Sequence, residues 1–426
     1  MKANLRSPVW LVAGVRSPFG RVDGAMKALD AVALSVPVAK AMATQLAPAD
    51  RPDLVVWGTV MANLGWSNIA REVMIDAGLD QATPAFSTVL ACSTSMAATF
   101  EAAGMLGGAF DLAMAGGVES MSRVQIGLSQ GLSDWLRRLT QARTFGERVD
   151  RFIDIRTKDI RLYVPSVTNR ATGKSMGEHC EEMVKTWKVT REAQDAIALA
   201  SHQRAVQAMA SGFFDDLVIT VEGASKDMLP RADTSPERLA KLKPAFDRAS
   251  GQGTITAGNA SPLTDGAAAI WVATDEGLKR APANRARVKL IDWEIAAVDV
   301  FQEGLLMAPA YAIPRLLARH GLTLDAIDLW EIHEAFAAQV LCNVAALESE
   351  AFLRDKAKVT APLGKFPWPR LNPNGGSVAI GHPFGATGAR ILSQAVKELA
   401  AMGPGKRAVV SICADGGLGT VALLES

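Results

Sequence analysis

The amino-acid sequence predicts an α/β protein in which two similar halves each carry strands that alternate with helices. The first observation is a series of short, β-branched apolar runs in the first 120 residues, most of them followed by a segment of helical periodicity. The second is a shorter series in the same order after residue 276. Alternating strands and helices favour a layered α/β architecture with a largely parallel central sheet.

The first series contains three expected strands, at residues 8–14, 53–60 and 111–119, and two expected helices, at 31–46 and 69–77. The helices end before Pro48 and Gly78, which commonly terminate helices. Between the second helix and the last strand, residues 87–103 predict a strand, a sharp turn and a further helix, which ends at glycines 107 and 108.

The second series indicates an internal duplication. Residues 328–333 are similar to 53–60, and residues 407–417 are similar to 111–119 with its glycines. Two α/β halves place their loop ends against each other, a usual position for an active site. The predicted domains are an N-terminal half at 1–122, completed by 253–275, an inserted loop or lid domain at 123–252, and a C-terminal half at 276–426.

The inserted segment contains a basic and apolar stretch. Residues 131–163 carry eight basic and five acidic side chains, and apolar and basic residues alternate at helical spacing. A solvated helical lid explains this pattern, and so does an interfacial segment that contacts acidic lipid or a partner. Residues 190–213 predict a helix with Thr190 as its N-cap and Gly212 at its end.

The composition is that of a globular protein with a large core. Hydrophobic residues make up 49% and charged residues 21% of the 426 residues, and the net charge of +1 gives no sign of nucleic-acid binding. The four cysteines form no CxxC pair, which predicts reduced thiols rather than disulfides or a zinc site. No apolar run approaches the roughly 20 residues that span a bilayer, and no signal peptide is recognisable. We therefore expect a cytoplasmic protein.

Cys92 is the first candidate catalytic residue. It follows the β-branched run and precedes a series of small residues that tolerate a helix, so it lies on the first turn of the predicted helix. Unpaired amides and the positive end of a helix favour a thiolate there. The alternative is a small, buried apolar residue without a chemical role.

Two histidines lie in turns. His333 ends a predicted strand in Glu331–Phe336 (EIHEAF), and Ala337 at the fourth position after it excludes the HExxH zinc motif. His382 lies in the glycine-rich run 374–388 (NGGSVAIGHPFGATG), which has neither a Walker lysine nor GxGxxG. A histidine held in such a turn suits a base beside a carbonyl group, although each histidine could also be purely structural.

Two further stretches suit the same chemistry. Cys413 ends a predicted strand before Asp415, Gly416 and Gly417, where a thiol can act as an acid or base or remain an inert core residue. Residues 253–269 form a loop of small residues against which an extended ligand could lie along the backbone.

Together these motifs resemble the thiolases. The chain carries AGGVESM at 115–121, GNASPLTDGAAA at 258–269, HEAF at 333–336, the 374–388 run and CADGGLG at 413–419. HEAF, GHPFGATG and the basic insertion are most similar to the β-subunit of the fatty-acid oxidation trifunctional complex and its bacterial counterparts. The resemblance implies a five-layered α-β-α-β-α thiolase fold of two duplicated halves with an inserted loop domain.

The resemblance also implies roles for individual residues. Cys92 would be the nucleophile, His382 its activator, and Cys413 the acid or base for the acetyl-CoA carbanion. His333 would help form the first oxyanion hole, and the backbone amides of Cys92 and Asp415 the second. Coenzyme A and the acyl chain would contact five further residues: Ser261, Met176, Ala257, Gly258 and Phe336.

The implied activity is that of a 3-ketoacyl-CoA thiolase, an acyltransferase that moves an acyl group to coenzyme A in fatty-acid β-oxidation and releases acetyl-CoA. The alternative within the class is a biosynthetic acetyl-CoA acetyltransferase. A ketosynthase also uses one cysteine and two histidines but does not need Cys413. A non-catalytic scaffold subunit is the alternative from another class.

The sequence departs from the family at two places. Asp415 stands where Gly or Ala is usual, and its carboxylate would raise the pKa of Cys413 or point away from it. Pro262 and Leu263 replace the usual Gly-Leu in the loop that contacts pantetheine.

Cofactors and partners are expected from the resemblance. Coenzyme A is a co-substrate, with no permanently bound cofactor and no metal. A homodimer through the N-terminal halves is expected, with a hydratase/dehydrogenase α-subunit as a further partner. Residues 131–163 would contact that subunit or a membrane, which would place the protein peripherally at the inner membrane face.

Overall fold

The computed structural model describes residues 7–426, which divide into two compact units. The main unit comprises the described residues up to Arg123 together with Asn169–Ser426, and the second unit is Val124–Thr168. The separate unit is therefore shorter than the predicted insertion at 123–252. Residues 169–252 belong to the main unit because their helices bury side chains such as Cys180 and Ala198 in its cores.

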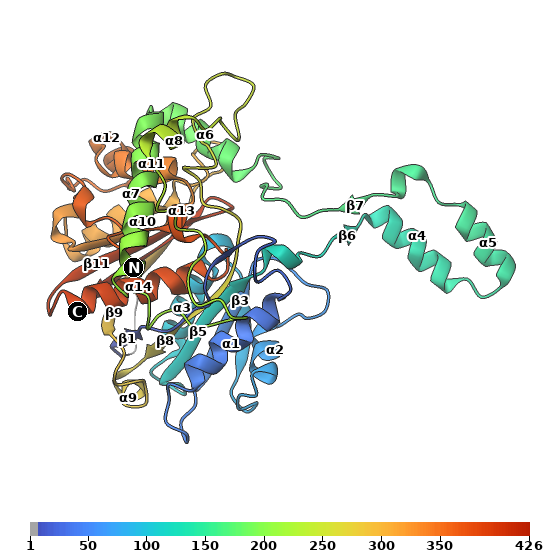
Figure 1. The fold of residues 1–426 in the computed structure, drawn as a ribbon, viewed down its shortest axis with the longest axis horizontal. Helices are drawn as coiled ribbons and strands as arrows, with labels where there is room; N and C mark the ends of the chain where they lie inside the picture. Colours follow the sequence, from blue (N-terminus) through green and yellow to red (C-terminus); the bar gives the residue numbers. More distant parts are fainter. Residues whose placement is uncertain (1–6) are drawn as a thin grey trace. The chain divides into compact units, whose positions relative to one another are not determined.

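The main unit is built around a ten-stranded sheet (Figure 1). Nine strands follow the order β10-β11-β12-β9-β1-β8-β5-β3-β4, and β2 pairs with β8. Their bounds are β1 (Val9–Val12), β2 (Gly20–Arg21), β3 (Leu54–Thr59), β4 (Ala85–Thr88), β5 (Leu112–Glu119), β8 (Thr264–Ala273), β9 (Arg287–Ala297), β10 (Leu329–Ile332), β11 (Arg407–Ala414) and β12 (Leu418–Glu425).

The strand order confirms the predicted duplication. β3-β5-β8-β1 in one half corresponds to β10-β11-β12-β9 in the other, with one parallel pair followed by two antiparallel pairs in each. The two halves join through the antiparallel pair β1 and β9. The expected largely parallel sheet is wrong, because short turns such as Asp415–Gly417 reverse the chain into an antiparallel neighbour.

Helices cover both faces of the sheet. Those of the N-terminal half are α1 (Ala31–Ala43), α2 (Ile69–Asp76) and α3 (Thr94–Met105). The others in the main unit are α6 (Met176–Trp187), α7 (Arg191–Ala210), α8 (Pro236–Ala240), α9 (Asp275–Leu278), α10 (Ala308–His320), α11 (Ala337–Leu347), α12 (Glu350–Phe352), α13 (Ser377–Ile380) and α14 (Thr387–Ala401). Thr190 caps α7, as predicted.

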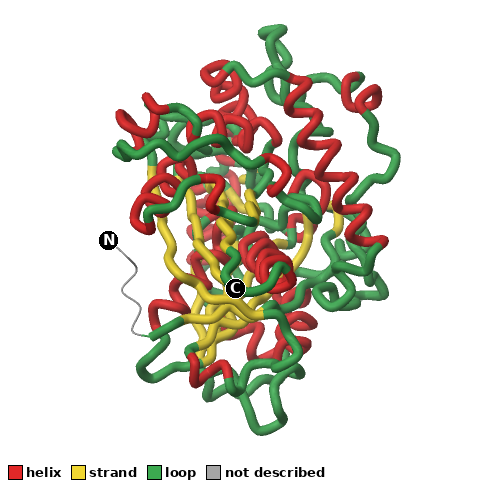
Figure 2. Tube along the Cα trace, turned by 90° about the vertical axis from the view of Figure 1, so that its left-hand side faces the viewer, coloured by secondary structure: helices red, strands yellow, loops and turns green. Residues whose placement is uncertain are grey.

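Alternating side chains of the strands face different cores, which gives five layers. On β3, Trp57 faces the core that contains α1 and α2, whereas Val56 faces a central core formed with α3 and α14. On β11, Val410 faces the same central core and Val409 faces the outer core of α10 and α11. Figure 2 shows the strands in the interior with helices on either side.

The central layer depends on a close contact between two helix starts. A side chain at Gly388 in α14 would overlap the backbone of Met96 in α3. The Ala389 amide also donates a hydrogen bond to Ser95 Oγ at 2.9 Å. The backbones of the two helices can therefore approach only because residue 388 is glycine.

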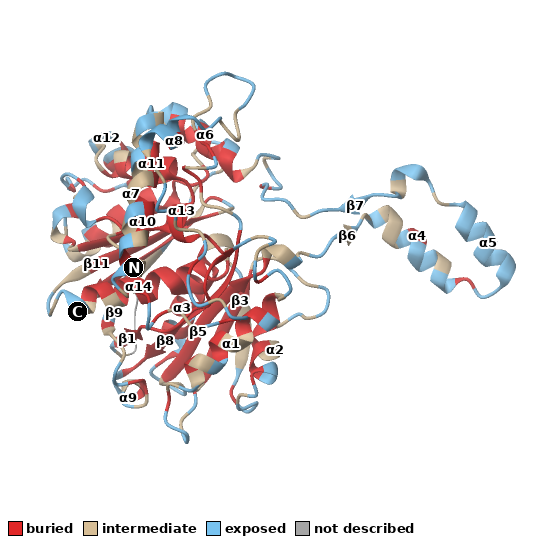
Figure 3. Cartoon of the chain, in the orientation of Figure 1, coloured by how far each residue is buried: buried red, intermediate tan, exposed pale blue. Residues whose placement is uncertain are grey.

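The second unit is a small hairpin. β6 (Gly127–Leu128) pairs with β7 (Leu162–Tyr163), and α4 (Gln130–Gln141) and α5 (Phe145–Ile153) lie between them. Trp135 Nε1 donates to the Arg151 carbonyl at 2.7 Å. Most of its side chains are exposed (Figure 3). Among the residues that the structure describes, no helix is long and apolar enough to cross a bilayer.

The Gly388 contact can be tested by adding one methyl group. We expect Gly388→Ala to lower the free energy of unfolding by about 1–3 kcal/mol or more, because the new Cβ overlaps backbone atoms. Gly104→Ala is the matched control in α3, since nothing lies within 4 Å of its Cβ position, and it should stabilise the helix by about 0.5–1 kcal/mol. Thermal unfolding at one scan rate measures both, and equal midpoints would contradict the contact.

Candidate active site

Cys92 lies on a tight turn between β4 and α3. The turn is a short 3-10 helix (Ala91–Ser93), and Ala91 has a φ of 44°, in the left-handed region that alanine rarely adopts. Thr94 stabilises the turn, because its Oγ1 accepts from the Leu90 amide at 2.9 Å and donates to the Ala91 carbonyl at 2.8 Å. The strand, turn and helix predicted around Cys92 are therefore present.

The thiol of Cys92 is protonated in this environment. Burial raises its pKa to about 12, although the backbone amides of Asp415 and Cys92 itself act in the opposite direction. The charges of Asp415 and Glu119 raise it further. The expected thiolate at the helix start is thus wrong, because the desolvation of the sulfur outweighs the amides.

His382 is held in one tautomer by Thr387. The Thr387 hydroxyl donates to the Pro383 carbonyl at 2.8 Å, so it accepts from His382 Nδ1–H, 2.6 Å away. The Nε2 atom then carries a lone pair and has no hydrogen-bond partner among the described residues. Burial and the Arg390 charge lower the pKa of His382 to about 3, so the ring is neutral and can accept a proton at Nε2.

His333 lies directly beside His382. The two ring centroids are 4.1 Å apart. The His333 backbone amide donates to the Ser411 carbonyl at 2.8 Å, and its Nδ1 lies 2.9 Å from Ser377 Oγ. Burial, and then the charges of His382 and Arg390, lower the pKa of His333 well below its usual value.

Cys413 is a buried residue of β11 whose thiol interacts electrostatically with Cys92. Burial and the Cys92 charge raise the pKa of Cys413 well above its usual value. Both sulfurs are therefore protonated at neutral pH, and the thiol of Cys413 is available as a proton donor.

The Asp415 carboxylate acts on Cys92 rather than on Cys413. Its charge raises the pKa of Cys92, and it is not among the causes of the shift at Cys413. Asp415 Oδ1 accepts hydrogen bonds from Asn169 Nδ2 at 2.8 Å and from the Gly416 amide at 2.6 Å. The Asp415 charge therefore does not raise the pKa of Cys413, which was one of the two expectations. It raises the pKa of the neighbouring thiol of Cys92 instead.

The loop predicted to contact coenzyme A runs between the two histidine segments. Ala260 pairs with Phe336, and Leu263 pairs with His382. The amide and the hydroxyl of Ser261 both donate to the Ala335 carbonyl, each at 3.0 Å. This part of the loop therefore lies against both the HEAF and the GHPFGATG segments.

The remaining predicted contact residues have different exposures. Ala257 is exposed and Gly258 is half-buried. Met176, the first residue of α6, is buried in the same core as Phe336 and Cys413. The structure thus places Met176 and Phe336 in the core that contains Cys413 and leaves Ala257 at the surface.

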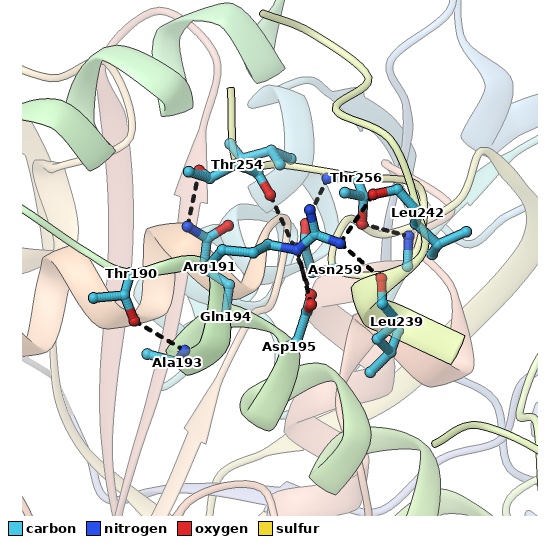
Figure 4. A network of polar contacts seen from close by, with 12 residues as sticks. Thr190, Arg191, Ala193, Gln194, Asp195, Leu239, Leu242, Thr254, Thr256 and Asn259 are labelled. Atoms are coloured by element: carbon cyan, nitrogen blue, oxygen red, sulfur yellow. Dashed lines mark hydrogen bonds and ion pairs between the residues drawn. The ribbon is translucent and has the colours of Figure 1, made fainter. Parts of the chain in front are cut away.

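The start of this loop is anchored by α7 (Figure 4). Asn259 Nδ2 donates to Asp195 at 2.9 Å, and Arg191 Nε donates to the other oxygen of Asp195 at 2.8 Å. Gln194 Nε2 also donates to Thr254 Oγ1 at 3.0 Å. The turn that carries Ala257 and Gly258 is therefore hydrogen-bonded to α7 through residues both before and after it.

Comparison with known proteins places the chain in a family. The family description "Thiolase, N-terminal domain" matches residues 9–276, and "Thiolase, C-terminal domain" matches residues 284–426. The chain belongs to the thiolase family. Thiolases are acyltransferases, so the chain is a member of an enzyme family that transfers acyl groups.

Several relatives match over nearly the full length of the thiolase chain. It is 39% identical to a 3-ketoacyl-CoA thiolase of Citrobacter koseri, over 98% of this chain and 96% of the relative. A 3-ketoacyl-CoA thiolase of Yersinia enterocolitica is 37% identical, over 97% of this chain and 96% of the relative.

Two solved structures share the fold. The crystal structure of the Bacillus anthracis acetyl-CoA acetyltransferase is 32% identical, with a TM-score of 0.79 and 99% of both chains covered. The Acat5 thiolase from Ascaris suum, in complex with coenzyme A, is 28% identical, with a TM-score of 0.80 and coverage of 98% of this chain and 100% of that chain.

Sequence reasoning missed four residues that shape the site: Thr387, Ser377, Arg390 and Asn169. Thr387 and Ser377 lie inside the glycine-rich run 374–388, and Arg390 lies two residues after it. Polar side chains within or beside such a run are a signal by which these three residues could have been found. Asn169 is in an unremarkable polar stretch, and nothing in the sequence connects it with Asp415.

The effect of Asp415 on Cys92 can be measured by alkylation. We expect Asp415→Asn to lower the pKa of Cys92, because the substitution removes a negative charge and keeps an oxygen for Asn169. Alkylation of Cys92 by iodoacetamide at mildly alkaline pH should become faster, as more thiolate is present. Asp355→Asn, at an exposed residue, is the control. An unchanged or slower rate would show that the charge does not reach the sulfur.

Proposed function

We propose that this thiolase is a 3-ketoacyl-CoA thiolase that transfers an acyl group from 3-ketoacyl-CoA to coenzyme A and releases acetyl-CoA in fatty-acid β-oxidation. The observation that carries the proposal is the electrostatic interaction of two thiols, that of half-buried Cys92 and that of buried Cys413, in a site that also holds a neutral histidine pair. The full-length relatives named 3-ketoacyl-CoA thiolase support the same substrate class.

In the first step Cys92 attacks the 3-keto carbon. His382 Nε2 takes the thiol proton during the attack, because both partners are neutral beforehand. The amides of Cys92 and Asp415 stabilise the oxygen that gains negative charge, since both already interact with the Cys92 sulfur. The product is an acyl thioester on Cys92.

In the second step the bond between C2 and C3 breaks, and acetyl-CoA leaves as an enolate. Cys413 supplies the proton that the enolate carbon needs. His333 and His382, whose rings lie 4.1 Å apart, would stabilise the charge on the thioester oxygen. A second coenzyme A then accepts the acyl group from Cys92. Ser261 would contact its pantetheine arm, Met176 the acyl chain, and Ala257, Gly258 and Phe336 the rest of the ligand.

The alternative is a biosynthetic acetyl-CoA acetyltransferase that acts on acetoacetyl-CoA. The similarity to the Bacillus anthracis acetyl-CoA acetyltransferase, at 32% identity, favours this alternative. The higher identity of 39% to a 3-ketoacyl-CoA thiolase favours the degradative activity. Cys413 argues against a ketosynthase, which needs one cysteine, and four chemically competent side chains argue against a scaffold subunit.

Partners and location are also proposals. We expect a homodimer through the N-terminal halves, and a hydratase/dehydrogenase α-subunit that would form a trifunctional complex in the cytoplasm. Within the second unit, Phe145, Phe152 and Ile153 expose large apolar side chains next to basic residues. This combination suits a peripheral contact of residues 131–163 with an acidic membrane surface.

Thiolytic turnover tests the activity. Wild-type protein should cleave 3-ketoacyl-CoA of medium and long chain with coenzyme A as acceptor. Cys92→Ser and Cys413→Ala should each lower turnover by about 10⁴-fold, since each removes a group that reacts directly. Cys342→Ala, at a buried cysteine of α11, is the control and should keep its turnover. Cleavage of acetoacetyl-CoA alone would support the biosynthetic alternative instead.

Flotation with vesicles tests the membrane contact. The wild-type chain should float with vesicles that contain acidic lipid and remain behind with neutral vesicles, because its basic residues need negative headgroups. A variant in which Phe145, Phe152 and Ile153 are replaced by Ser should lose flotation and keep thiolytic turnover. Equal flotation of the two proteins would rule out this contact.

A further inference from the structure

Ser377 connects a buried cation with His333. The Arg390 guanidinium donates to Ser377 Oγ at 2.7 Å, and the same oxygen lies 2.9 Å from His333 Nδ1. All three side chains are buried, and they come from α14, α13 and the segment after β10. The contacts therefore form a continuous path from Arg390 to the imidazole.

Counting donors and acceptors assigns the protons along this path. A guanidinium carries only donors, so Ser377 accepts from Arg390. The hydroxyl has one proton of its own, and His333 Nδ1 is the acceptor within reach. If His333 instead donated from Nδ1, the buried hydroxyl proton would have no acceptor among the described contacts, which costs about 1–3 kcal/mol. Ser377 thus donates to Nδ1, and the ring proton of His333 lies on Nε2.

The Nε2 atoms of the two neighbouring histidines therefore have opposite hydrogen-bonding roles. Thr387 accepts from His382 Nδ1–H, which leaves a lone pair on Nε2 of that ring. Ser377 donates to His333 Nδ1, which leaves an N–H at Nε2. Both Nε2 atoms are buried without a hydrogen-bond partner among the described residues. One ring is therefore a proton acceptor and the other a hydrogen-bond donor, from positions 4.1 Å apart.

We propose that Ser377 and Arg390 are positioning residues that hold His333 as the Nε2–H tautomer, so that it donates a hydrogen bond to the thioester oxygen of the substrate. This role rests on the proposed function for its substrate, although the tautomer itself does not. The positive charge of Arg390 acts in the same direction, because it opposes protonation of the imidazole. A neutral His333 also leaves His382 free to take the proton of Cys92.

The tautomers can be observed without turnover. In ¹⁵N spectra of the full chain with labelled histidine, His333 should show a protonated Nε2 and an unprotonated Nδ1, and His382 the reverse. The chain has five histidines, and loss of a signal in His333→Gln or His382→Gln assigns each ring. A protonated Nδ1 on His333 would overturn the proposal even if the protein cleaves 3-ketoacyl-CoA.

The Ser377→Ala substitution distinguishes a positioning role of Ser377 from a purely structural role. Ser377→Ala should lower thiolytic turnover on the order of 10²-fold, because the donor to the thioester oxygen is no longer held. Alkylation of Cys92 should keep its wild-type rate, since the path from Ser377 does not include the thiol. Unchanged turnover, or an equal fall of both rates, would overturn the proposal.

Ser35→Ala is the matched control. Ser35 is equally buried, and its hydroxyl also accepts from an N–H, Trp57 Nε1 at 3.1 Å, and donates to a carbonyl, Ala31 O at 2.7 Å. It lies in the outer core of α1 and should affect stability without changing turnover. If the wild-type protein does not cleave 3-ketoacyl-CoA, the proposed function is contradicted. The tautomer of His333 can still be measured in that case.

Discussion

The contact between the first turns of α3 and α14 is the constraint on which the arrangement of the site depends. Both helices begin shortly after a residue of the proposed site, α3 after Cys92 and α14 after His382. The absence of a side chain at Gly388 lets the two backbones meet, and the Ala389–Ser95 hydrogen bond sets their register. Because the two halves of the sheet pack on opposite sides of this helix pair, a shift here would move Cys92 relative to His382.

The two thiols and two imidazoles of the proposed site are all uncharged before reaction. Burial keeps both thiols protonated and both imidazoles neutral, so no buried ion pair has to be desolvated or broken when substrate enters. Negative charge develops on the reacting oxygen only as the reaction proceeds. The amides of Cys92 and Asp415 and the N–H groups of the histidine rings can then stabilise that charge. This arrangement stabilises the transition state more than the resting state.

Much of the architecture could be predicted from local patterns, and the same patterns single out the four residues that we propose to react. Cys92 and Cys413 end apolar runs, and His333 and His382 lie in turns with distinctive neighbours, so a short stretch of sequence was sufficient for each. The mixed direction of the sheet could not be predicted, because it depends on which distant strands pair. The orientation of a hydroxyl proton at Ser377 or Thr387 depends on partners from other segments in the same way. The net pKa shift of Cys92 also required its burial, which sequence position alone does not give.

The protonated state of the two cysteines has a consequence for the lifetime of the protein. Peroxides and disulfides react with thiolates and hardly with thiols. With the pKa of Cys92 raised to about 12 and that of Cys413 raised well above its usual value, neither sulfur is an efficient target for such oxidants. The same burial that keeps both thiols protonated therefore slows their oxidation while no substrate is bound.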